Sequence, residues 1–109
     1  MDSETRWRAA VAEFVARMRA LYGSALDRIV LFGSRARKDA REDSDVDLLV
    51  VLKQMGAVHG EMHKIDPIAS DISLKYDVVL VPFAISIDDF QNGEMPFAAA
   101  GRREGVLVE

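Results

Sequence analysis

The sequence contains no cysteine among its 109 residues, and no apolar stretch approaches the ~20 residues that a membrane-spanning helix needs. Without cysteine, disulfides and thiolate metal sites are excluded, and we expect an intracellular, cytoplasmic protein that does not associate with membranes. The acidic first residues, Met1-Asp-Ser-Glu, begin a helical pattern. We therefore do not expect a signal peptide.

An excess of basic charge is also missing, because 14 Lys and Arg stand against 18 Asp and Glu, a net charge of −4. This balance argues against direct nucleic-acid binding through general electrostatic attraction. The charge is uneven, however: residues 1–41 carry +4 (nine basic, five acidic) and residues 42–109 carry −8 (five basic, thirteen acidic). Charge alone favours a solvated loop at this change of sign over a site that handles anions and cations together.

Half of the residues are apolar and 29% are charged, which is the composition of a folded protein. We interpret residues 1–109 as a single domain with one modest core. Apolar periodicity predicts, in chain order, a helix at 4–22, a strand at 28–32, a short helix at 34–40, a strand at 45–52, a helix at 58–75, a strand at 76–81, and helices at 87–91 and 96–104. This alternation predicts an α/β (α+β) fold with a small sheet flanked by helices.

Two prolines bear on these boundaries. Pro67 lies inside the helix predicted at 58–75, so we expect either a kink there or a restart with Asp66 as the cap. Pro82 is expected to end the strand at 76–81. The apolar residues near the end, Val106 to Val108 among them, are expected to pack with the last helix, with a partner surface as the alternative.

Two aspartates, Asp45 and Asp47, begin the strand predicted at 45–52. Because side chains two residues apart on a strand share a face, both carboxylates should point the same way and repel each other. A hard divalent cation relieves this repulsion, and Mg²⁺ prefers carboxylate oxygens. An exposed strand start explains an isolated Asp-x-Asp equally well, so the pair alone predicts no metal.

A second element, Gly33-Ser34, follows one strand directly and precedes a helix. Glycine lets the backbone approach a ligand closely, and the start of a helix offers free N–H groups to an anion. For an isolated Gly-Ser, a tight turn with Ser34 as an ordinary helix cap is the simpler interpretation.

A third acid, Asp77, lies near the start of the strand predicted at 76–81. If that strand neighbours the strand at 45–52, Asp77 can meet Asp45 and Asp47 at one end of the sheet. An exposed residue at a helix-to-strand junction is the alternative interpretation.

The order of these elements is more specific than any one of them: a strand, Gly33-Ser34, ten residues, Asp45-x-Asp47, a strand, a helix, and a strand with Asp77. The stretch Leu31-Phe-Gly-Ser-Arg-Ala-Arg-Lys-Asp-Ala-Arg-Glu-Asp-Ser-Asp-Val-Asp-Leu-Leu-Val50 resembles the DNA polymerase β-like nucleotidyltransferase superfamily. Within it, the chain is similar to the minimal nucleotidyltransferases, the small partners of HEPN-domain proteins in toxin–antitoxin pairs. The resemblance runs from about residue 4 to the C-terminus and is weakest at the end.

The resemblance implies a mixed sheet of three or four strands with flanking helices, the polymerase β-like nucleotidyltransferase fold. It implies an enzyme that joins a nucleoside monophosphate to an acceptor hydroxyl and releases pyrophosphate. The implied nucleotide-binding residues are Gly33, Ser34 and Arg35, and the implied catalytic residues, which bind one or two Mg²⁺ ions, are Asp45, Asp47 and Asp77. Asp77 would match the third carboxylate, which helps to bind the second metal or accepts the acceptor's proton.

The resemblance further implies ATP as the donor and, as acceptor, a hydroxyl (expected on tyrosine) of a HEPN ribonuclease toxin. After Asp77 only 32 residues follow, too few for the helical domain that shapes the acceptor pocket in small-molecule transferases of this superfamily. Two alternatives stay open. One is a non-catalytic module that neutralises a HEPN partner by contact, and the other is an aminoglycoside-type transferase whose pocket forms between two copies of the chain, as a homo-oligomer.

Overall fold

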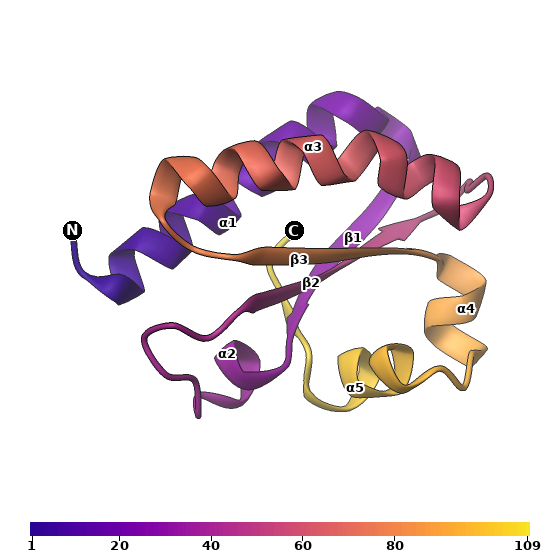
Figure 1. Ribbon diagram of the computed structural model, residues 1–109. Helices are drawn as coiled ribbons and strands as arrows, with labels where there is room; N and C mark the ends of the chain where they lie inside the picture. Colours follow the sequence, from indigo (N-terminus) through magenta and orange to yellow (C-terminus); the bar gives the residue numbers. More distant parts are fainter.

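A four-stranded mixed sheet forms the centre of the molecule, in the computed structural model that describes residues 1–109. Helices α1 and α3 cover one face, and the short helices α4 and α5 cover the other (Figure 1). The elements are α1 (Ser3–Tyr22), a 3-10 turn η1 (Gly23–Ala25), β1 (Leu26–Phe32), α2 (Ser34–Arg37), β2 (Val46–Leu52), α3 (Val58–Tyr76), β3 (Leu80–Ser86), α4 (Ile87–Asn92), α5 (Pro96–Glu104) and β4 (Val106–Leu107). The predicted α/β fold is confirmed. None of the helices is long and apolar enough to cross a membrane.

The strand order is β3-β2-β1-β4, with β1 antiparallel to both β2 and β4 and β2 parallel to β3. The central strand β2 is buried on both faces, which explains its continuous apolar run. Alternate residues of β2 join two separate clusters: Val46, Leu48 and Val50 pack with α1 and α3, and Leu49 and Val51 pack with α4 and α5. By the same alternation, Asp47 belongs to the face of α4 and α5.

The helix predicted at 58–75 is one helix, α3, that continues through Pro67 rather than restarting there. Pro67 is exposed, so water can reach the carbonyl one turn earlier that loses its donor. Helix α1 is also close to its predicted bounds. It begins after Asp2, whose carboxylate accepts a hydrogen bond from the Thr5 N–H at 2.8 Å.

The prediction for the third strand is wrong in its position. Tyr76 still belongs to α3, and β3 begins at Leu80 and runs through Pro82 to Ser86. Proline is tolerated because β3 is an edge strand, paired only with β2, so the missing N–H can face away from the ladder. The tail also differs from expectation, because Val106 and Leu107 form a fourth strand, β4, on β1.

Candidate active site

The Asp45-x-Asp47 pair lies at the start of β2, beside the turn that follows β1. Asp47 pairs with Phe32 of β1, so the next residue, Gly33, lies against the Asp47 carboxylate. A Cβ atom on Gly33 would overlap the Asp47 carboxylate oxygen, and Gly33 has a φ of 75°, which favours glycine. The structure therefore brings together the two motifs that are ten residues apart in the sequence.

The two carboxylates differ in environment, because Asp45 is exposed and Asp47 is half-buried. Burial raises the pKa of Asp47, the nearby charge of Asp45 raises it further, and the Arg37 guanidinium lowers it. Two adjacent oxygen donors whose negative charges oppose each other suit a hard divalent cation such as Mg²⁺. Asp45 and Asp47 thus fit the expected metal by donor chemistry.

Ser34 is the first residue of α2, and Gly33 takes the cap position without a side-chain hydrogen bond. The Gly33 carbonyl accepts from the N–H groups of Ala36 and Arg37, at 3.1 and 3.0 Å. The simpler interpretation of Ser34 as a helix cap is therefore wrong, and its hydroxyl is not used to cap α2. The start of α2 lies beside the start of β2 (Figure 1), where an anion could meet both a hydroxyl and backbone N–H groups.

The two arginines of α2 have different contacts. Arg35 donates from Nη2 to the carbonyl oxygens of Glu42 (3.2 Å) and Ser44 (3.0 Å). Arg37 forms ion pairs with Asp39 and with Glu104, the latter at 3.2 Å. Arg37 is not among the site residues predicted above, yet it is the cation that lowers the pKa of Asp47. Its partner Glu104 is 67 residues away, and no local pattern signals such a pair.

The structure does not bring the Asp77 side chain to the other two acids. Asp77 ends α3 in a left-handed conformation with φ 54°, its side chain is 96% exposed, and the carboxylate lies 4.0 Å from Arg6 of α1. No group of three His, Cys, Asp or Glu residues is arranged to hold a metal ion. Because β3 begins three residues later, the cap of a helix, rather than the pleat of a strand, sets the direction of Asp77. Its backbone is still near this end of the sheet, where the Val46 N–H donates to the Val79 carbonyl at 2.8 Å.

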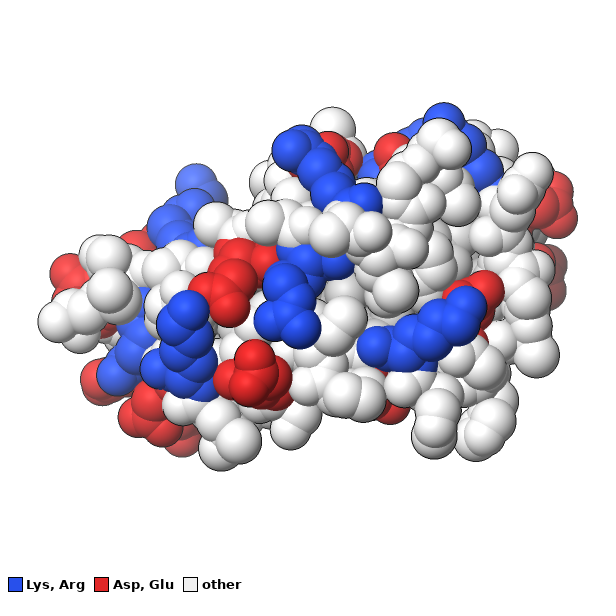
Figure 2. Space-filling view, turned by 90° about the horizontal axis from the view of Figure 1, so that it is seen from above, with Lys and Arg blue, Asp and Glu red and all other residues white.

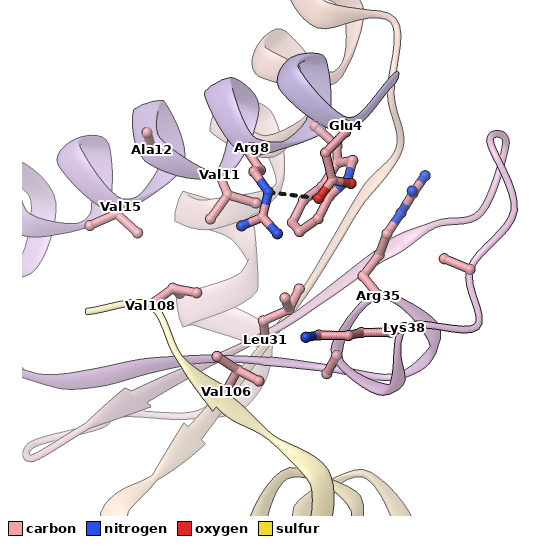
Figure 3. A pocket seen from close by; sticks show the side chains of 13 residues that line it. Glu4, Arg8, Val11, Ala12, Val15, Leu31, Arg35, Lys38, Val106 and Val108 are labelled. Atoms are coloured by element: carbon pink, nitrogen blue, oxygen red, sulfur yellow. Dashed lines mark hydrogen bonds and ion pairs between the residues drawn. The ribbon is translucent and has the colours of Figure 1, made fainter. Parts of the chain in front are cut away.

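A separate cavity of about 760 Å³ lies between α1, β1, α2 and β4 (Figure 3). Its lining is largely apolar, and Arg35 and Lys38 contribute to it from the side of α2. The carboxylates of Asp45 and Asp47 are not part of it. On one face of the molecule, basic and acidic side chains are interspersed with uncharged surface rather than gathered into a broad basic patch (Figure 2).

Comparison with known proteins identifies the family of this chain. The family of the nucleotidyltransferase domain matches residues 11–95, which include both motifs. "Putative protein adenylyltransferase MJ0141" of Methanocaldococcus jannaschii is 44% identical over 66% of this chain and 72% of its own length. Two more proteins of that organism bear the same description, MJ0604 (37% identical) and MJ1305 (35% identical), and the chain spans 65% and 53% of their lengths.

Solved structures show the same fold. The structure of a "putative nucleotidyltransferase" from Sulfolobus solfataricus has a TM-score of 0.68 at 21% identity, covering 98% of this chain and 86% of its own. The structure of a "putative minimal nucleotidyltransferase" has a TM-score of 0.57 at 27% identity over 97% and 95% of the two chains. A chain from a toxin–antitoxin structure with AMP-PNP has a TM-score of 0.60 at 14% identity over 87% and 69%. With the motifs side by side at the start of β2 and the family match extending across both, this chain belongs to the nucleotidyltransferase domain family and is a nucleotidyltransferase.

Proposed function

We propose that this chain transfers AMP from ATP, with Mg²⁺, to a hydroxyl group on a protein partner. The observation that carries the proposal is the contact between Gly33 and the Asp47 carboxylate, which places the Gly-Ser turn beside the acid pair. The names of the M. jannaschii relatives support the adenylyl group and the protein acceptor. In the reaction, the acceptor hydroxyl gives its proton to a carboxylate, Asp77 in this proposal, and its oxygen forms a bond to the α-phosphorus. The bond from that phosphorus to the bridging β-phosphate oxygen breaks, and pyrophosphate leaves.

In this proposal Asp45 and Asp47 hold the metal, and Gly33 and Ser34 receive the triphosphate. Bound Mg²⁺ would supply positive charge to the phosphate oxygens as the leaving group departs. The Ser34 hydroxyl and the backbone N–H groups that begin α2 would donate to the nonbridging oxygens. Asp77 corresponds to the third acid of the motif, and its side chain would have to turn away from Arg6 to reach the acceptor hydroxyl.

We further propose that the partner is a HEPN ribonuclease toxin and that this chain acts in the cytoplasm as its antitoxin. The fold shared with a chain of a toxin–antitoxin structure supports this assignment. An AMP group joined to a tyrosine of such a partner would add a bulky anion, which would repel the phosphates of RNA.

The first experiment is a calorimetric titration of ATP against the wild type and Asp45→Asn, each with Mg²⁺ and with EDTA. We expect ATP binding that depends on Mg²⁺ in the wild type and is lost in Asp45→Asn, whose circular dichroism spectrum should be unchanged. Loss of the fold in Asp45→Asn would argue against a metal-binding role, because removing one of two repelling acids should not destabilise the protein.

The second experiment tests the transfer itself. A HEPN-domain ribonuclease would be incubated with this chain and with ATP labelled on the α- or the γ-phosphate. Label from the α-phosphate alone should become covalently attached to the HEPN protein, at a tyrosine identified by mass spectrometry. Neutralisation of the ribonuclease without any transferred label would instead establish the non-catalytic binding module.

A further inference from the structure

We propose that Arg35 is a positioning residue that fixes the loop carrying Asp45, rather than a ligand of the nucleotide. The inference rests on the proposed function in that Asp45 is taken to hold the metal. The two acids differ in how firmly the backbone holds them. Asp47 lies within β2 and is held by ladder pairing to Phe32 and Val81, whereas Asp45 precedes the strand and is exposed.

The loop from Lys38 to Asp45 has no helix or strand of its own. Within it, the Arg41 N–H donates to the Ser44 hydroxyl at 2.8 Å, and the Ser44 N–H donates to the Arg41 carbonyl at 3.1 Å. Arg35 adds two bonds from one nitrogen, to the carbonyls of Glu42 at 3.2 Å and Ser44 at 3.0 Å. The Ser44 carbonyl belongs to the peptide group that leads into Asp45. Because a peptide group is planar, the orientation of this carbonyl fixes the position of the Asp45 nitrogen and Cα, from which the side chain extends.

Arg35 is itself held in place by α1. Its guanidinium carbon lies 5.4 Å from the centre of the Trp7 ring. Trp7 is 4% exposed, and its indole N–H donates to the Glu4 carboxylate at 2.8 Å. Figure 3 shows Arg35 extending from α2 toward the first turn of α1. The side chain thus connects α1, α2 and the loop before β2.

These contacts use the particular chemistry of arginine. A planar guanidinium can donate in its plane to two carbonyls while its face lies near an aromatic ring, and a lysine ammonium cannot do both. The Nε atom of Arg35 is buried without a hydrogen-bond partner, so the side chain keeps this position although one donor is unsatisfied. Both loop bonds use Nη2, and Nε is buried, so Arg35 could bind a phosphate in the two-point manner typical of arginine only if Nη2 released the loop.

The first test needs neither metal nor nucleotide. Amide hydrogen exchange of Arg41, Ser44 and Val46 is compared in metal-free wild type, Arg35→Met and Arg35→Lys. We expect at least tenfold faster exchange in Arg35→Met and only partial rescue by Arg35→Lys. The matched control is Arg8→Met, because Arg8 also lies over Trp7, at 4.7 Å, but binds Glu4 rather than the loop. Unchanged exchange in Arg35→Met would overturn the proposal.

The second test separates positioning from phosphate binding. ATP binding to the same variants is titrated by calorimetry as a function of Mg²⁺ concentration. For a positioning residue, Arg35→Met should need about tenfold more Mg²⁺, while its affinity for ATP at saturating Mg²⁺ stays within twofold of the wild type. A large loss of ATP affinity at saturating Mg²⁺, restored by Arg35→Lys, would make Arg35 a phosphate ligand and overturn the inference. If wild type binds no ATP, the proposed function fails instead, and the exchange experiment still decides the role of Arg35 in the loop.

Discussion

Replacing Gly33 with alanine tests the central feature of the site, the close approach of the β1–α2 turn to Asp47. Two costs add. Gly33 has φ 75° and ψ −156°, a region almost confined to glycine, and alanine there costs about 1–3 kcal/mol. The new Cβ would overlap the Asp47 carboxylate oxygen, which overpacks the turn and adds about 1–3 kcal/mol. For a chain of this size, each kcal/mol lowers the Tm by roughly 4 °C.

Two other glycines of the same chain provide controls. Gly23 also has a positive φ, 54°, but a Cβ there meets nothing within 4 Å, so Gly23→Ala carries the backbone cost alone. Gly60 lies in α3 without a positive φ and with open space around it, and Gly60→Ala should stabilise the protein by about 0.5–1 kcal/mol.

The assay is urea denaturation followed by circular dichroism, with Mg²⁺-ATP binding measured on the same samples. We expect Gly33→Ala to lose more stability than Gly23→Ala and, in addition, to lose Mg²⁺-dependent ATP binding, because the Asp47 carboxylate must move away from the new methyl group. Equal destabilisation by Gly33→Ala and Gly23→Ala would refute the close approach of Gly33 to Asp47.

Three further changes have defined directions. The folded-state pKa of Asp47 is raised by burial and by Asp45, so the ionised carboxylate opposes folding at neutral pH. Asp47→Asn should therefore raise the metal-free Tm at pH 7 but not below the unfolded pKa of about 4. Scanning calorimetry in EDTA would show this difference, and an equal gain in Tm at both pH values would contradict it. The pKa of Glu61 is lowered, chiefly by the Gly56 N–H that donates to its carboxylate at 2.9 Å. The carboxylate therefore stabilises the fold above its unfolded pKa, and this contribution is lost as the pH falls through the folded pKa. In urea denaturation, Glu61→Gln should lower the free energy of unfolding by about 1–3 kcal/mol at pH 7 and by clearly less at pH 3. Ser34→Ala should weaken Mg²⁺-ATP binding by about 0.5–1.5 kcal/mol, one hydrogen bond, and unchanged affinity in calorimetry would remove the Ser34 hydroxyl from the nucleotide site.

Short-range features of this protein were readable from the sequence. The Gly33-Ser34 turn and the Asp45-x-Asp47 strand start are local, since their conformations depend on neighbouring residues. The apolar runs at 28–32 and 45–52 predicted two strands, and both are present as β1 and β2.

Contacts between elements far apart in the sequence decided the start of β3, the position of Asp77 and the role of Arg35. Where the cap of α3 gives way to β3 depends on which neighbour supplies the hydrogen bonds. The Val78 N–H still donates to α3, whereas the Val79 carbonyl accepts from β2 and the ladder runs from Leu80. The strand begins four residues later than predicted, which leaves Asp77 in the cap of α3, facing Arg6, so the third acid is separate from the other two. The contact of Arg35 with the Ser44 carbonyl and Trp7 likewise needs α1, α2 and the loop together. A sequence pattern specifies side-chain type and local backbone, but which groups meet across elements is settled only when the chain packs.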